Sequence, residues 1–328
     1  MSEVIDRIWS VVGRPLTRIR QIEVRSTAHF LDNMLNSALN PGDYLSNRRT
    51  LARLEAQLEA LAAQYSTVEG IPKLLHFVFG FKTREFFPYY AMLAIRSAMY
   101  HNQKWPAVLH YHHEPYGEHW DSIKQKLILN QIPDFSRFGI ARVSHYAHKS
   151  DIVRLLALNS IGGAYLDIDT LTVRSFEMLT ENPFVMAVQA NHYGARGGLC
   201  NAAMLGQRAS LFGNRWLKHY RYFHSRGRDY LWDFHSVKLP AILASKHTLE
   251  LKILDHDAFF YPMWTDVQRI LLAEDSEKWL AYLQPAFLFH LWNNFTEESL
   301  LRIDESFVRT SRSAYAAFAR PVIDGGFE

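Results

Sequence analysis

The stretch from Ser150 to Thr170 constrains the fold more than any other, because its hydrophobic period changes at a pair of glycines. Between Ser150 and the glycines, apolar residues recur at helical spacing. The Ser150 hydroxyl suits a helix N-cap. Gly162 and Gly163 can adopt positive φ and end the helix. After them, apolar and polar residues alternate up to Asp169, which is the two-residue period of a strand. The stretch therefore predicts a helix, a tight turn and a short strand that ends in carboxylates.

Charged residues cluster in the same stretch. Asp167 and Asp169 would share one face of the strand, with Cα atoms about 6–7 Å apart. Carboxylates this close raise each other's pKa unless a cation lies between them, and a divalent ion with oxygen ligands is the simplest partner. Asp151 and Arg154 are three residues apart on the predicted helix and also share a face. Either pair alone is common on protein surfaces, but together they predict a functional site.

The chain from Ile71 onward alternates between short apolar runs and amphipathic stretches. This order predicts an α/β fold with a largely parallel sheet and helices on both of its faces. Ligands of such sheets bind beyond the carboxyl ends of the strands, which is where Asp167 and Asp169 would lie. The expected strands are 74–79, 107–112, 140–144, 184–189, 201–205 and 286–292, and the expected helices are 86–101, 118–129, 210–224 and 238–246.

Residues 1–70 differ from the rest because strand-like runs are scarce there. Apolar residues at three- and four-residue spacing predict an amphipathic helix over 47–65. Such a helix could pack on its own domain, pair with another chain, or lie on a membrane surface through nearby arginines; we favour the first. The predicted organisation is an N-terminal helical extension (1–70), an α/β domain (71–295) and a C-terminal tail packed on that domain (296–328).

The composition excludes some function classes. A net charge of +3 without a long basic run gives no reason to expect a nucleic-acid partner. The single cysteine, Cys200, rules out an intramolecular disulfide and suits a reducing compartment. No apolar run is long enough for a membrane span, and charged residues interrupt the first 20 positions. We therefore predict a cytoplasmic protein, with peripheral association at the inner membrane face through the N-terminal helices as an added expectation.

Three segments together resemble a known family. Ser150-Asp151-x-x-Arg154 followed by Gly162-Gly163-x-Tyr165-x-Asp167-x-Asp169 resembles the signature of the DXD-containing sugar transferases of glycosyltransferase family 32, whose core the large glucosylating toxins share. Ile71-Pro72-Lys73-Leu74-Leu75-His76 is similar to the family's first nucleotide-binding strand, and His290-Leu291-Trp292-Asn293 to its C-terminal His-x-Trp segment. The resemblance spans 71–295. It implies a Rossmann-like GT-A fold, a nucleotide-sugar donor that is usually a UDP-sugar, Mn²⁺ or Mg²⁺, and retention of anomeric configuration.

The resemblance also implies roles for individual residues. Asp151 and Arg154 would hold hydroxyls of the donor sugar, and Asn201 matches a position that faces this sugar. His76 would contact the nucleotide, although a histidine in an apolar strand is often a core residue, and Tyr165 would form a wall of the site. The first strand has phenylalanines where the family often has a tryptophan, so the residue that stacks on uracil is not identified.

The metal and diphosphate contacts follow from the same resemblance. Asp167 would contact the ribose or the metal, and Asp169 would coordinate the metal directly. His290 is a further candidate metal ligand, and Trp292 a candidate diphosphate contact. A divalent ion and an imidazole or indole N–H can stabilise the charge that develops on a leaving nucleotide diphosphate.

The predicted activity is transfer of a sugar to a glycan, lipid-linked or polysaccharide acceptor. A protein acceptor, as for the related toxins, is an alternative. A second alternative is a phosphatase similar to haloacid dehalogenases, in which Asp167 would be the nucleophile and Asp169 the acid–base group. Such domains normally open with the Asp-bearing strand, whereas here it lies in mid-chain.

Overall fold

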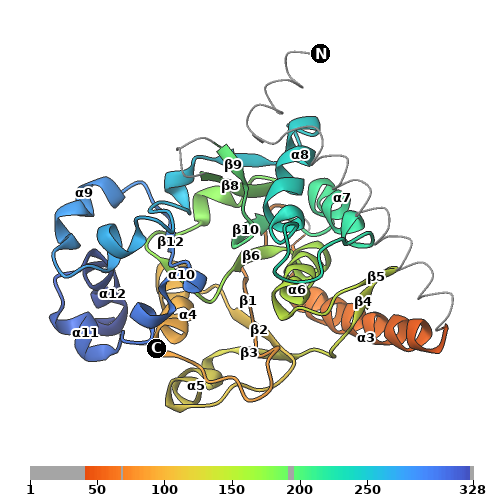
Figure 1. The fold of residues 1–328 in the computed structure, drawn as a ribbon, viewed down its shortest axis with the longest axis horizontal. Coiled ribbons are helices and arrows are strands. Elements are labelled where there is room, and N and C mark those ends of the chain that lie inside the picture. Colours follow the sequence, from red (N-terminus) through yellow and green to blue (C-terminus); the bar gives the residue numbers. More distant parts are fainter. Residues whose placement is uncertain (1–40, 68, 191–195, 326–328) are drawn as a thin grey trace.

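The computed structural model describes residues 41–67, 69–190 and 196–325. At its centre is a mixed, mostly parallel sheet of eight strands in the order β11-β8-β10-β6-β1-β2-β3, with β9 paired to β8 (Figure 1). Strand β10 runs antiparallel to both of its neighbours. The predicted α/β class is confirmed. The strands are β1 (Leu75–Phe79), β2 (Ala107–Tyr111), β3 (Ile128–Gln131), β6 (Gly163–Leu166), β8 (Phe184–Ala190), β9 (Arg196–Leu199), β10 (Ala203–Gly206) and β11 (Lys252–Leu254).

Helices cover both faces of this sheet, as the alternating elements predicted (Figure 1). Successive side chains of β1 point to opposite faces, so Leu75 and Phe77 pack in one hydrophobic cluster and Val78 in the other. The first cluster includes α4 (Tyr89–His101) and α12 (Ala314–Asp324), and the second includes α3 (Pro41–Tyr65), α6 (Tyr146–Ser160), α7 (Leu211–Tyr220) and α8 (Leu239–Lys246). The remaining α-helices of the described residues are α5 (Glu118–Ile123), α9 (Leu280–Leu283), α10 (Asn293–Leu300) and α11 (Glu305–Thr310).

The described part of the N-terminal extension packs on the α/β core. Helix α3 contains the predicted 47–65 segment, and its apolar side chains Leu54, Leu58 and Ala62 are buried in the same cluster as α6. Residues 1–40 of the predicted extension lie outside the described residues. Within the described part of the chain, no helix combines the length and the hydropathy needed to cross a membrane.

Two predicted elements are wrong. The helix expected over 118–129 ends at Ile123, and Ile128–Gln131 instead forms the edge strand β3, which pairs with β2. Hydrogen bonds to a neighbouring strand therefore override the local helical pattern. The strand expected over 140–144 is only the short hairpin of β4 (Arg137–Phe138) and β5 (Ala141–Arg142), because Gly139 reverses the chain at φ 59°.

Helix α6 begins five residues earlier than predicted. His145 is its N-cap and accepts a hydrogen bond from the Ala147 backbone N–H through Nδ1. Ser150 therefore lies in the second turn, and its hydroxyl is free to accept from Arg154 at 3.1 Å. The predicted end is right, since Gly162 and Gly163 follow the helix with φ of 84° and 121°.

A small second sheet joins distant parts of the chain. Strand β7 (Thr170–Thr172) directly follows the Asp-x-Asp segment and pairs antiparallel with β12 (Leu288–His290), with His290 opposite Thr170. This pairing carries the C-terminal His-x-Trp segment to the carboxyl end of β6. Helix α10 starts directly after it (Figure 1).

Candidate active site

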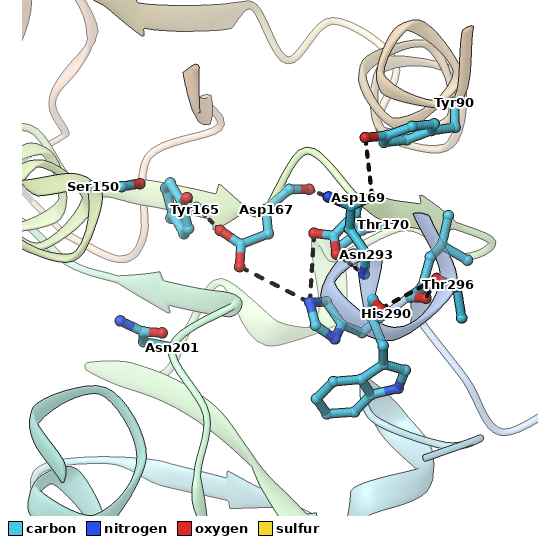
Figure 2. A network of polar contacts seen from close by, with 12 residues as sticks. Tyr90, Ser150, Tyr165, Asp167, Asp169, Thr170, Asn201, His290, Asn293 and Thr296 are labelled. Carbon is cyan, nitrogen blue, oxygen red and sulfur yellow. Dashed lines mark hydrogen bonds and ion pairs between the residues drawn. The ribbon is translucent and has the colours of Figure 1, made fainter. Parts of the chain in front are cut away.

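The two carboxylates lie in a turn rather than on a strand. Strand β6 ends at Leu166, and the backbone N–H of Asp167 donates to Ala202 O at 2.7 Å. Two residues later, Asp169 O accepts from the Leu291 N–H at 2.8 Å. These bonds hold the turn between β10 and the C-terminal segment, so the two side chains converge although the expected strand alternation is absent (Figure 2).

Asp167 uses one carboxylate oxygen for contacts within the protein. The Tyr165 hydroxyl donates to Oδ1 at 2.6 Å, and Arg154 Nη2 lies 3.0 Å from the same oxygen. The other oxygen, Oδ2, lies 4.0 Å from His290 Nε2. Burial raises the pKa of Asp167 above its ordinary value; the Arg154 guanidinium opposes this increase and Asp169 adds to it.

The two carboxylate oxygens of Asp169 also have different contacts. Oδ2 accepts from the backbone N–H of Asn293 at 2.8 Å, and Oδ1 lies 3.5 Å from His290 Nε2. Burial alone would raise the pKa of Asp169, but His290 and the Asn293 N–H lower it below its ordinary value. Burial alone would likewise lower the pKa of His290, yet Asp169 raises it. The two side chains thus favour an ionised pair.

One oxygen of each carboxylate and the imidazole Nε2 are therefore left facing one another. Among the described residues, Asp167, Asp169 and His290 are the group that could hold a metal ion, with ligand atoms all within 4.8 Å of one another. Ligands about 2.1 Å from one octahedral ion lie about 3–4 Å apart, and the two distances to Nε2 fall in this range. Carboxylate oxygens suit Mg²⁺ and Mn²⁺, so the donor set fits the predicted ion.

A second polar network lies on the α6 side. Arg154 Nη1 donates to Asn201 O at 2.9 Å and to Asn201 Oδ1 at 3.1 Å, and Nη2 donates to Ser150 Oγ. Asn201 Nδ2 donates in turn to Asp151 Oδ1 at 2.7 Å. The guanidinium also lies over the Tyr165 ring, 4.4 Å from its centroid. Arg154 is thus held by Asn201, Ser150 and the Tyr165 ring as well as by Asp167, and its side chain is only 7% exposed.

These groups border a cavity of about 630 Å³ at the carboxyl edge of the sheet. Ser150 and Arg154 line it on the α6 side, and the loop 79–86 after β1 lines another wall. The predicted site residues on its surface are Arg154, Asp167, Asp169, His290 and Trp292. The arrangement offers a fixed guanidinium, a candidate ion site and a space large enough for a nucleotide-sized ligand.

Comparison with known proteins identifies the family. Residues 88–185 match the model described as a glycosyltransferase sugar-binding region containing a DXD motif. The chain is 34% identical over 266 residues to "Glucan organizing enzyme 1" of Cryptococcus neoformans var. grubii, across 77% of this chain and 71% of the fungal protein. The chain belongs to the DXD-containing glycosyltransferases.

Solved structures similar to this glycosyltransferase include the PaToxG glycosyltransferase, at 15% identity and a TM-score of 0.40, covering 86% of this chain and 97% of that one. Another is the galactosyltransferase LgtC in complex with donor and acceptor sugar analogs, at 14% identity and a TM-score of 0.36, covering 71% and 98%. The enzyme has the predicted mostly parallel sheet flanked by helices, with the Asp-x-Asp turn at the carboxyl edge of that sheet. Family membership removes the phosphatase alternative.

His76, a candidate nucleotide contact, is buried in the core. This side chain is 0% exposed, with Nε2 2.8 Å from Gly162 O and Nδ1 3.0 Å from His110 Nε2. Burial lowers the pKa of His76 to about 4, so the ring is neutral at pH 7. In this structure His76 is therefore a core residue that links β1 to the turn after α6.

Three other predicted contacts lie behind the cavity wall. Tyr165 is 0% exposed, and Asp151 and Asn201 are 6% and 5% exposed. None of them is among the residues on the cavity surface. In this structure they support the residues that line the cavity: Tyr165 orients Asp167, while Asp151 and Asn201 orient Arg154.

Trp292 lines the cavity, but its indole N–H is bonded within the protein. Its Nε1 donates to Pro262 O at 2.9 Å, and its ring meets the His290 ring edge-on at 4.2 Å between centroids. Its backbone is left-handed, with φ 57°, at the start of α10. A diphosphate contact from this nitrogen would require the bond to Pro262 to break.

Sequence reasoning missed the loop that follows β1. Residues 79–86 form one wall of the cavity, and Gly80 has φ 77° where a Cβ atom would lie 2.2 Å from His113 O. The available signal was position, because a loop at the carboxyl end of a central parallel strand faces the ligand site. Phe295 on α10 was also missed, since nothing in the local pattern distinguishes it from a core residue.

Proposed function

We propose that this glycosyltransferase is metal-dependent and transfers a sugar from a UDP-sugar to a glycan acceptor with retention of configuration. The observation that carries the proposal is the convergence of Asp167 Oδ2, Asp169 Oδ1 and His290 Nε2, while the second oxygen of each carboxylate is held by the protein. Such a division keeps both carboxylates fixed and leaves one oxygen of each for an ion.

In this proposal each group has a separate task. Asp167, Asp169 and His290 hold Mn²⁺ or Mg²⁺, which when bound stabilises the charge on the nucleotide diphosphate. Arg154 reaches the cavity and holds hydroxyls of the donor sugar, and Asp151 and Asn201 keep the guanidinium in one direction.

The proposed transfer is a front-face displacement. The bond between the anomeric carbon and the diphosphate oxygen breaks, and the bond to the acceptor oxygen forms on the same face. The proton of the acceptor hydroxyl passes to the leaving diphosphate oxygen. This course needs no basic residue on the opposite face of the sugar. The name of the fungal relative refers to glucan, which supports a glycan rather than a protein acceptor.

Calorimetry with UDP and UDP-glucose, with and without Mn²⁺, tests the proposal. We expect metal-dependent binding that Asp169→Asn abolishes. The amide oxygen of asparagine can still accept from the Asn293 N–H, so α10 keeps its start. Asp275→Asn, at an exposed carboxylate far from the cavity residues, is the matched control and should bind as the unaltered protein does.

Two other outcomes would contradict the assignments. Metal-dependent binding that survives Asp169→Asn would place the ion elsewhere. No binding of uridine nucleotides under either condition would exclude a UDP-sugar donor.

A further inference from the structure

Part of the cavity lining comes from the start of α4 and from helix α10. Phe86 and Tyr90 lie before and within the first turn of α4, and Phe295, Glu297 and Leu301 lie in α10 or directly after it. We call these five residues the aromatic arm. The Tyr90 hydroxyl donates to Asn293 Oδ1 at 3.2 Å and joins α4 to α10 (Figure 2). The arm opens onto Asp169 and His290, which border the same cavity.

Large apolar side chains are exposed in this arm. Phe295 is 67% exposed, Leu301 57% and Phe86 45%. A single exposed apolar side chain is ordinary, but three on the wall of one cavity indicate a surface that a ligand covers.

Both rings are held in place by aromatic neighbours. The Phe295 ring stacks on Trp264 at 6.2 Å between centroids, with an interplanar angle of 24°. The Phe86 ring meets Tyr116 edge-on at 5.8 Å, and the missing side chain of Gly117 leaves room for it, since a Cβ atom there would lie 2.7 Å from the ring. Rings fixed in this way can bind a flat partner without a further loss of side-chain entropy.

Carboxylates lie near Tyr90 in the arm. Burial raises the pKa of Tyr90, and the carboxylates of Asp169, Glu297 and Glu85 raise it further. Glu297 has no ion-pair partner among the residues that the structure describes, so its oxygens are available to hydroxyl donors. A carboxylate of this kind suits a ligand that carries many hydroxyl groups.

We propose that the aromatic arm binds the acceptor as a neutral saccharide, with a pyranose ring stacked on Phe295 and hydroxyls donating to Glu297. The inference rests on the proposed function and deepens it by naming the acceptor class and its binding residues. The C–H face of a pyranose is apolar and packs on an aromatic ring, while its hydroxyl rim needs hydrogen-bond acceptors. An acceptor held here reaches the reacting carbon because the arm opens directly onto the candidate ion site.

The test separates acceptor from donor effects with the 328-residue chain. The probes are neutral glucose pentasaccharides (laminaripentaose, maltopentaose and cellopentaose), with UDP-glucose and Mn²⁺. In Phe295→Ala we expect the acceptor KM to rise about tenfold, the scale of one aromatic stacking contact. UDP affinity and donor hydrolysis without acceptor should stay unchanged, and Phe295→Trp should restore the acceptor KM. Tyr282→Ala, at an equally exposed aromatic residue outside the cavity, should change nothing.

Several results would overturn the inference. A loss of UDP affinity in Phe295→Ala would mean that the ring stacks on the nucleobase. An unchanged acceptor KM would remove the arm from the acceptor site. Transfer to a polypeptide with no transfer to or binding of any of the three saccharides would replace the acceptor class. Absence of UDP binding in the unaltered protein is a separate result that refutes the proposed function itself, and this inference with it.

Discussion

Replacement of Arg154 by methionine tests how much the ion pairs of this buried side chain contribute to stability. The guanidinium lies 3.0 Å from Asp167 Oδ1 and 3.7 Å from Asp151 Oδ1, and the exposed fractions of the three side chains are 7%, 23% and 8%. Methionine has a similar length and fills the space, but it leaves both carboxylates without their cation. Removal of one partner from a buried ion pair typically destabilises a protein by about 3–5 kcal/mol. We expect the free energy of unfolding of Arg154→Met to fall by this amount at neutral pH.

Arg154→Lys separates charge from geometry. Lysine keeps the positive charge, but it cannot donate to Asn201 and Ser150 at once as the planar guanidinium does. We therefore expect a smaller loss of about 2 kcal/mol, close to one or two charge-assisted hydrogen bonds.

The double variant Arg154→Met with Asp167→Asn identifies the cause. If the loss comes from an unpaired carboxylate, then neutralising Asp167 recovers part of the stability, and the two changes are not additive. Arg208→Met is the matched control, because Arg208 pairs with Glu59 at 2.6 Å but its side chain is 43% exposed. We expect this control to lose less than about 1 kcal/mol.

Urea denaturation at about pH 8 and about pH 5 measures these values and checks their sign. Burial raises the pKa of Asp167 and Arg154 opposes the increase, so removal of the guanidinium raises this pKa further. The folded state then binds more protons than the unfolded state between the ordinary pKa and the raised one, and stability falls as pH rises through that window. The deficit of Arg154→Met should thus be smaller at the lower pH. Equal deficits at both values, or no recovery in the double variant, would refute the reasoning.

Three further predictions concern the core around the site. Burial lowers the pKa of His76 from 6.5 to about 4 and also lowers that of His110, so between pH 7 and pH 4 the unfolded state binds more protons than the folded state. Urea denaturation should therefore show that the free energy of unfolding falls by about 3 kcal/mol or more from pH 7 to pH 4. A free energy that does not change over this range would contradict the prediction. Gly163→Ala should lower the melting temperature strongly, since φ is 121° and the new Cβ would lie 2.6 Å from a backbone oxygen, whereas Gly42→Ala, with nothing within 4 Å, should not lower it. Asn201→Ala should cost about 2 kcal/mol of stability and reduce donor hydrolysis about tenfold, because two buried charged partners lose a hydrogen bond; unchanged hydrolysis would remove its positioning role.

The local sequence predicted the helix, turn and strand around the carboxylates. Gly162 and Gly163 adopt the positive φ that only glycine reaches readily, and the change of period marks the passage from α6 to β6. These features depend on neighbouring residues, so they can be predicted from the sequence. The starts of α4 and α6 were less accurate, because a helix start depends on which group caps it.

The family resemblance identified most of the candidate site residues, but the sequence did not show which of them line the cavity and which are buried behind it. Arg154, Asp167, Asp169 and His290 are on the cavity surface, whereas His76 and Tyr165 are fully buried. A strand pattern says which face a side chain takes, and only the packed helices decide whether that face is open to a ligand. The domain boundaries, the cytoplasmic location, the membrane association and the anomeric outcome stay predictions.

The tertiary structure alone decided how the site is assembled. His290 reaches Asp169 because β7 pairs with β12, and Asn201 reaches Arg154 because β10 runs antiparallel beside β6. Pairings between distant segments depend on packing across the whole core and on the entropy of closing long loops, neither of which a short window of sequence contains. The sequence by itself determined the helix, the double-glycine turn and the strand that precede the carboxylates, and the fold decided how the carboxylates are presented and which side chains meet.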